Sequence, residues 1–344
     1  MSESASARGR NAIIRAILEG IIEPNERVAE IAYYCAMCGN CNEICKLEFD
    51  NTEIVEAFRR DLVNMGLTLR SAEQIAKNIE VEGNPYGKAK ERRFERLRTP
   101  LKHKGGDFLY FVGCVTAYNL SFVANAAIKI FETAGADFTL METEECCCLP
   151  LLKLGFHNLA EKKIERLLNL LREKGVKKIV FSCPGCYRAF RKDYPELGFE
   201  VPFELVFITE YVEDLLEKGK LEIKDKIKEK VAYHDPCELG RHLGIYDSPR
   251  NVLKSILESE IVEMERNKSR AFCCGVPIGL TYPEVGEEIA VERVKEAIST
   301  NAEILATECP GCIIYLELAR RKLGSKIKVK SVSELLSEVI GRGK

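Results

Sequence analysis

Cysteine is the residue type whose number and spacing in this 344-residue chain point to chemistry, because 14 of its 15 cysteines fall into three spaced sets. Thiolates are soft ligands that suit zinc or iron–sulfur clusters. Inert core thiols would be scattered singly, and disulfides are rare in a reducing compartment. The sequence therefore predicts metal centres and leaves zinc and iron–sulfur clusters as the alternatives.

The N-terminal set consists of Cys35, Cys38, Cys41 and Cys45, with the spacing C-x2-C-x2-C-x3-C. In ferredoxins this spacing lets three thiolates on a tight loop and a fourth on the following helix hold a [4Fe-4S] cluster. A four-thiolate zinc site is the alternative, but zinc knuckles usually separate two C-x2-C pairs by a longer loop. Ferredoxin motifs normally place proline after the last cysteine, whereas this chain has Lys46.

Two larger sets follow, with five cysteines each. They are Cys114, Cys146, Cys147, Cys183 and Cys186, and then Cys237, Cys273, Cys274, Cys309 and Cys312. Matching landmarks lie 123 positions (114 to 237), 127 positions (146 to 273) and 126 positions (183 to 309) apart, which indicates an internal duplication. A tetrahedral zinc ion takes four ligands and would leave a spare thiol in each set.

Short strands are predicted to position these cysteines. Apolar runs at 108–112, 178–181, 230–233 and 303–306 lead toward cysteines, with amphipathic helical patterns between them. This alternation predicts an α/β fold with a mainly parallel sheet, whose strand ends can bring thiols to one edge. Residues 1–104 instead show the apolar spacing of helices. We therefore expect a helical, ferredoxin-like segment (1–104) followed by two duplicated α/β units (105–220 and 221–344).

Composition excludes several classes of protein. The net charge of -2 gives no basic excess for nucleic-acid binding. Residues 1–10 lack an apolar run of the secretory type, and no stretch approaches the roughly 20 apolar residues of a membrane-spanning helix. We expect a cytoplasmic protein that reaches the inner face of a membrane only through partner subunits. The basic run at 88–98 is predicted to be a solvated linker helix rather than a docking face for a redox partner.

The most specific motif is Tyr-His-Asp-Pro-Cys-Glu-Leu-Gly-Arg-His at 233–242, together with Cys273-Cys274-Gly275. With these motifs the chain resembles, over nearly its whole length, the cysteine-rich CCG-domain family. That family includes the B and D subunits of heterodisulfide reductase and the iron–sulfur subunits of glycolate, lactate and anaerobic glycerol-3-phosphate dehydrogenases. The resemblance implies that each five-cysteine set holds a non-cubane four-iron cluster. It also implies that these thiols, as cluster ligands, flank a disulfide substrate that is split by successive one-electron steps.

The resemblance raises a question about the N-terminal cluster. Residues 3–10 look like the segment that follows the first of two ferredoxin runs in glycolate-oxidase-type subunits, so that the first run is missing from this sequence. In two-cluster ferredoxins the fourth cysteine of each run ligates the other cluster. Either Cys45 closes a single cluster, or the partner run lies on another polypeptide or outside this reading frame.

The two five-cysteine sets differ at one place. The first reads Cys-Cys-Cys-Leu-Pro at 146–150, whereas the second reads Cys-Cys-Gly-Val-Pro at 273–277. Aligning the prolines leaves the first two cysteines of each run as ligands and puts Cys148 at the position of Gly275. Cys148 is then a spare thiol or an alternative ligand.

The completeness of both sets favours a heterodisulfide-reductase-like catalytic subunit. A subunit that only relays electrons would be expected to have lost part of one set. The sequence shows no flavin or nucleotide fingerprint, so electrons must come from a flavin-containing or membrane donor subunit through the cluster at Cys35 to Cys45. The alternative is an electron-transfer subunit between a flavin-dependent dehydrogenase, for a 2-hydroxy acid or glycerol phosphate, and another carrier.

Five polar residues are weaker candidates for the site. His234 and Asp235 could tune a cluster or relay a proton, although a structural turn before Cys237 is the simpler role. Arg188, Arg241 and His242 could hold an anionic substrate group, against ordinary surface roles.

Overall fold

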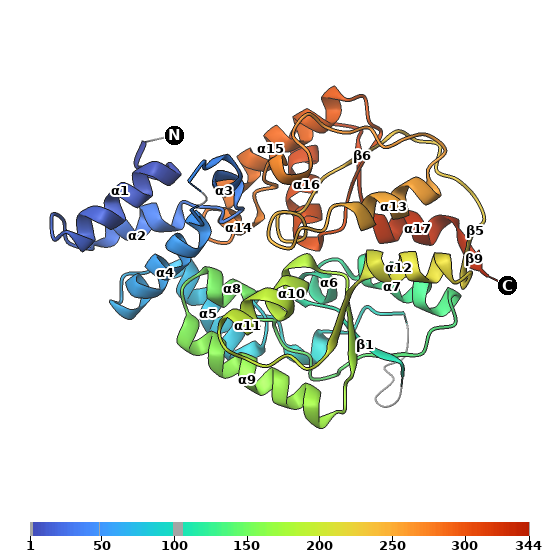
Figure 1. The fold of residues 1–344 in the computed structure, drawn as a ribbon, viewed down its shortest axis with the longest axis horizontal. Helices are drawn as coiled ribbons and strands as arrows, with labels where there is room; N and C mark the ends of the chain where they lie inside the picture. Colours follow the sequence, from blue (N-terminus) through green and yellow to red (C-terminus); the bar gives the residue numbers. More distant parts are fainter. Residues whose placement is uncertain (1–2, 48, 99–105, 344) are drawn as a thin grey trace.

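The structure, a computed structural model, describes residues 3–47, 49–98 and 106–343. A helical N-terminal part lies at one end of the molecule, and two α/β units lie against each other beside it (Figure 1). The α/β fold class predicted from the sequence is therefore confirmed. The predicted boundary between residues 104 and 105 lies outside the described residues.

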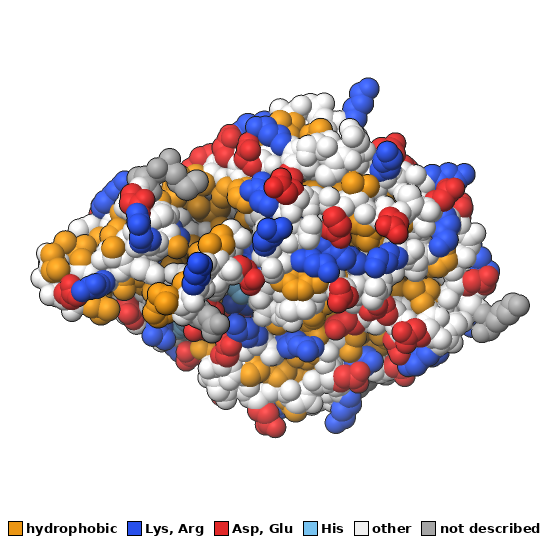
Figure 2. Space-filling model, turned by 45° about the horizontal axis from the view of Figure 1, so that its top comes forward, with side chains coloured by type: hydrophobic (Ala, Val, Ile, Leu, Met, Phe, Trp, Pro, Cys, Tyr) orange, Lys and Arg blue, Asp and Glu red, His pale blue; other side chains and the backbone are white. Residues whose placement is uncertain are grey.

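The N-terminal part begins with a short 3-10 turn, Glu3–Ala5, and continues as five helices. They are α1 (Ala7–Leu18), α2 (Glu26–Tyr33), α3 (Asn40–Ile44), α4 (Asn51–Asn64) and α5 (Arg70–Glu82). The side chains of Ser6, Asn25 and Asp50 accept hydrogen bonds from first-turn backbone N–H groups of α1, α2 and α4, which fixes where these helices begin. Large apolar side chains stay exposed here, including Leu18 (83% exposed) and Leu47 (75%), and Figure 2 shows apolar surface gathered at this end.

The first α/β unit is built on a parallel four-stranded sheet with the order β2-β1-β3-β4. Its strands are β1 (Phe108–Phe111), β2 (Phe138–Thr139), β3 (Lys178–Phe181) and β4 (Glu204–Phe207). Its helical elements are α6 (Cys114–Tyr118), α7 (Ser121–Thr133), α8 (Leu149–Lys153), α9 (His157–Glu173), α10 (Pro184–Arg188), the π-helical turn Ala189–Asp193, α11 (Tyr194–Glu196) and α12 (Ile208–Glu217). All four residues of β1 are buried, as expected for a strand with helices on both sides.

The second unit repeats this plan with three parallel strands in the order β6-β7-β8. They are β6 (Val231–Tyr233), β7 (Ile304–Thr307) and β8 (Lys328–Ser331), and a parallel bridge between Ala232 and Val262 stands where the first unit has β2. Its helices are α13 (Asp247–Ile256), α14 (Val276–Gly279), α15 (Pro283–Ser299), α16 (Pro310–Lys322) and α17 (Val332–Val339). The duplication inferred from cysteine spacing is thus visible in the strands.

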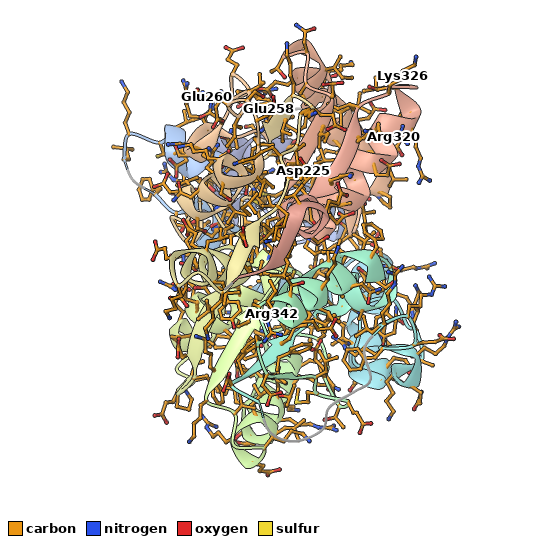
Figure 3. The ribbon with its side chains drawn as sticks, turned by 90° about the vertical axis from the view of Figure 1, so that its right-hand side faces the viewer. Asp225, Glu258, Glu260, Arg320, Lys326 and Arg342 are labelled. Carbon is orange, nitrogen blue, oxygen red and sulfur yellow. The ribbon has the colours of Figure 1, made fainter. Side chains whose placement is uncertain are left out.

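The two units are joined by helix packing. Helix α17 of the second unit packs against α7 of the first, and α13 packs against α12. Within the second unit, β5 (Leu221–Ile223) pairs antiparallel with β9 (Ile340–Arg342). Figure 3 shows Arg342 at the level where the units meet, with Arg320 and Lys326 at the outer edge of the second unit. None of the helices within the described residues combines the length and the apolar character that crossing a lipid bilayer would take.

The turn after each adjacent cysteine pair has a left-handed backbone. Gly275 has φ 88° and Cys148, at the matching position, has φ 59°. A Cβ atom on Gly275 would lie 2.0 Å from the backbone oxygen of Gly286 in α15, which leaves no room for a side chain. In the first unit α9 carries Ala160 at the position of Gly286, and Cys148 is accommodated with its side chain fully buried.

We expect Gly275→Ala to lower the free energy of unfolding by about 3 kcal/mol or more, because left-handed strain of about 1–3 kcal/mol is joined by the clash with α15. Gly324→Ala is the matched control, since φ is +61° there and nothing lies within 4 Å of its Cβ position. Urea denaturation of both variants measures the difference. Equal losses would mean that the approach of α15 does not constrain the turn.

Candidate metal centres

The first unit brings its five predicted cysteines together. Cys114 opens α6 directly after β1, Cys146 and Cys147 precede α8, and Cys183 and Cys186 flank the start of α10. Hydrogen bonds between thiols link these five cysteines in one chain, in the order Cys114, Cys146, Cys147, Cys186 and Cys183. Hydrogen bonds from Cys146 and Cys186 lower the pKa of the central Cys147 thiol.

The second unit forms a matching group. The sulfur atoms of Cys274 and Cys312 are 2.9 Å apart, and Cys273 and Cys309 hydrogen-bond with Cys274 and Cys312 respectively. Cys237 is fully buried beside them and close enough to interact electrostatically with Cys274. Hydrogen bonds from Cys273 and Cys312 lower the pKa of the Cys274 thiol, as happens at Cys147. Five soft donors gathered in one region fit an iron–sulfur cluster better than one zinc ion.

The N-terminal cysteines lie against the second unit. The thiol of Cys38 hydrogen-bonds with that of Cys273. Helix α3, which ends before Cys45, packs against the 3-10 turn Lys268–Arg270 of the second unit. Burial raises the pKa of the Cys41 thiol, and electrostatic interaction with Cys35 and Cys38 raises this pKa further. A centre formed by Cys35 to Cys45 would therefore adjoin the second five-cysteine group.

Three basic side chains fix this N-terminal loop by binding its carbonyl oxygens. Arg59 donates to the carbonyl oxygen of Cys35 at 2.9 Å and to the carbonyl oxygen of Lys153, in α8, at 2.7 Å. Arg241 donates to the Cys38 oxygen at 2.6 Å, and His242 Nε2 lies 3.2 Å from the Met37 oxygen. Arg241 and His242 therefore position the loop, and the substrate-binding role considered for them stays a prediction.

Arg188 also differs from its predicted role. It is buried and donates to Glu238 at 2.8 Å and to Asp193 at 3.0 Å, so its charge is neutralised inside the protein. Asp235 pairs with Arg250 at 2.6 Å and is structural, as the simpler prediction had it. The contact between Arg188 and Glu238 joins residues 50 positions apart in the sequence.

A cavity of about 580 Å3 lies between the two units and is lined by cysteines from each of them. All five cysteines of the first group contribute, and the second group contributes Cys309. Apolar side chains such as Leu149, Val276 and Ile314 form most of the remaining wall. Lys153 and Glu238, a buried ion pair that joins the two units, bring charge to it. A small molecule bound there would touch both groups in a largely apolar environment.

Arg93 was missed by sequence reasoning, which placed it in a solvated linker. It is 2% exposed and donates to the Cys114 sulfur at 3.6 and 3.7 Å while pairing with Glu144. Glu144 in turn accepts the backbone N–H groups of Val112 and Gly113 at 2.9 Å each. The ion pair therefore holds the turn that carries the first cysteine of the unit.

A family model for a cysteine-rich domain matches the chain twice, over residues 108–191 and 231–317. The D-type subunit of dihydromethanophenazine:CoB–CoM heterodisulfide reductase from Methanosarcina barkeri is 34% identical over 92% of this chain and 80% of its own length. The chain belongs to the cysteine-rich CCG-domain family. It is an iron–sulfur oxidoreductase component with a role in electron transfer.

Other relatives of this CCG protein are larger. EtfAB:quinone oxidoreductase from Syntrophomonas wolfei is 29% identical over 98% of this chain but only 49% of its own length. A crystal structure of a hypothetical protein from Helicobacter pylori covers 96% of this chain and 67% of its own, with a TM-score of 0.62 and 13% identity. That similarity supports the fold alone.

We expect Arg93→Met to lower the free energy of unfolding by about 3–5 kcal/mol, because it leaves the buried Glu144 carboxylate without a counter-charge. Arg92→Met is the matched control, since the adjacent Arg92 forms an exposed pair with Glu95, and it should change stability very little. Chemical denaturation of the two variants tests this. Similar small losses in both would contradict the structural role of Arg93.

Proposed function

We propose that this chain is the catalytic subunit of a heterodisulfide-reductase-like complex, which reduces a disulfide of the CoM–CoB type. The observation that carries the proposal is the cavity lined by all five cysteines of the first group and by Cys309 of the second. Reduction of a disulfide consumes two electrons and two protons and yields two thiols, so a substrate touching both groups can receive one electron from each side. The similarity to a heterodisulfide reductase subunit over most of its length supports the same reaction.

The proposed ligands of two non-cubane four-iron clusters are the ten cysteines of the α/β units. A cubane [4Fe-4S] cluster is assigned to Cys35, Cys38, Cys41 and Cys45. When bound, these clusters supply one-electron transfer. The proposed domains are the helical segment 1–104 and the units 105–220 and 221–344. The apolar walls of the cavity would exclude water from the site where the disulfide is cleaved.

Electrons would enter at the N-terminal cluster and pass first to the second unit, because the Cys38 and Cys273 thiols are in contact. The donor would be a flavin-containing or membrane subunit. Exposed apolar side chains beside Cys45, namely Ile44 (73% exposed), Leu47 (75%) and Phe49 (56%), suit a protein–protein contact there. Such a partner would also provide the contact with a membrane.

A second candidate function is an electron-transfer module between a flavoprotein and a quinone or another carrier. The similarity to EtfAB:quinone oxidoreductase over 98% of this chain favours it. In that case the cavity binds no disulfide, and the clusters respond only to protein partners.

The two functions differ in their response to small thiols. For a disulfide reductase, we expect the electron paramagnetic resonance (EPR) spectrum of the anaerobically purified protein to change when the disulfide or its thiol products are added. The control is a thioether of the same size, which cannot be reduced. A spectrum indifferent to disulfide and thiols, but altered by a reduced flavoprotein, would favour the electron-transfer module.

Cysteine variants test the proposed ligands. Cys147→Ser and Cys274→Ser should each remove roughly a third of the bound iron, since one of three four-iron clusters is lost. Cys148→Ser is the matched control beside Cys147, and we expect it to keep the full iron content because its thiol donates to the Cys146 carbonyl oxygen, at 3.4 Å. Iron loss in Cys148→Ser would make this thiol a ligand.

A further inference from the structure

The proposed reaction gives no role to His234, whose buried imidazole lies beside the second cysteine group. It follows β6, three residues before Cys237, and is 1% exposed. One of its ring nitrogens lies within 4.8 Å of the sulfur atoms of Cys274 and Cys312. The first unit has Phe111 three residues before Cys114, so this imidazole is specific to the second unit.

Arg293 determines which ring nitrogen carries the proton. Its Nε–H donates to His234 Nδ1 at 2.9 Å, and a guanidinium has no acceptor. Nδ1 must therefore offer its lone pair, which leaves the proton of the neutral ring on Nε2. Bonds from Arg293 to the Arg266 carbonyl oxygen (2.8 Å) and to Glu296 (2.9 Å) fix the guanidinium in place. Burial also lowers the pKa of His234 well below its ordinary range, which keeps the ring neutral.

The Nε2–H group has no hydrogen-bond partner among the residues that the structure describes. A buried donor without an acceptor is destabilising, so a partner is expected at this position. Direct ligation of a metal by Nε2 does not fit, because metal-bound histidines donate their other ring N–H to an acceptor. Here the other nitrogen receives a hydrogen bond instead.

We propose that His234 Nε2–H donates a hydrogen bond to a sulfur of the second unit's cluster and raises its reduction potential. The inference rests on the proposed function, in which the five cysteines of the second unit are the ligands of its cluster. Hydrogen bonds to cluster sulfurs are among the factors that set such potentials, because they stabilise the more negative, reduced state. Since Cys38 contacts Cys273, a raised potential favours the second cluster as acceptor of the entering electron.

The first unit has a different donor, the Arg93 guanidinium at Cys114. Changes at His234 should therefore affect one cluster alone. His234→Phe introduces the residue type of the first unit, whereas His234→Gln keeps an N–H donor at a similar distance from the backbone. This pair of variants separates the effect of the hydrogen bond on the reduction potential from the effect of side-chain shape.

The test is a redox titration of the holoprotein, followed by EPR spectroscopy, for the wild type and both variants. In His234→Phe we expect one cluster signal to become about tenfold harder to reduce, which is about 59 mV for one electron. The other signals and the iron content should stay unchanged, and His234→Gln should restore most of the shift. Unchanged potentials in His234→Phe would overturn the proposal.

A measurement on the wild type does not depend on how the variants fold. With 15N-labelled histidine, pulsed EPR should show a weak nitrogen coupling and an exchangeable proton at the second cluster. A strong coupling, or loss of iron in both variants, would make His234 a ligand and contradict the proposal. If disulfides leave every spectrum unchanged while the potential shift is present, the proposed reaction fails and the hydrogen bond stands.

Discussion

Ten cysteine sulfur atoms gathered in the interior impose a charge problem, and much of the surrounding structure resolves it. Thiolates removed from water need hydrogen-bond donors or opposite charge inside the protein. Arg93 supplies both at Cys114, and Glu144 limits the excess of positive charge by pairing with it. In the second unit His234 offers a neutral N–H held in place by Arg293. The buried ion pairs near the cysteines thus follow from the chemistry of the site.

The duplication has preserved the strands and changed the surroundings of the sulfur atoms. Parallel pairing of β1 with β3 and of β6 with β7 brings the cysteine-bearing turns to the same edge of each sheet. Around that edge the units differ, with Phe111 matching His234 and Cys148 matching Gly275. The glycine is required by the close approach of α15, not by the proposed cluster itself. Equivalent cysteines in the two units therefore have different neighbouring side chains. Such differences would allow the two copies of the fold to perform different steps of electron transfer.

The sequence predicted the features that depend on local spacing. The cysteine sets, the duplication and the α/β layering follow from short-range patterns and a constant offset. Long-range pairing was not predictable, because nothing local distinguishes a buried arginine from its solvated neighbours. Arg93 stands in a basic run, yet its partner Glu144 lies 51 positions away. Arg241 and His242, close to Cys237, suggested anion binding, but their partners are carbonyl oxygens more than 200 positions earlier.

The same long-range contacts explain how a single ferredoxin-type run can keep a defined shape. Met37 has φ 47°, a conformation that a residue with a side chain adopts only when its surroundings impose it. Arg59 binds the carbonyl oxygen of Cys35, His242 binds that of Met37 itself, and Arg241 binds that of Cys38. Contacts with distant parts of this chain therefore shape the loop. Because Arg241 and His242 belong to the same ten-residue motif as Cys237, that motif couples the position of the N-terminal centre to the second cysteine group.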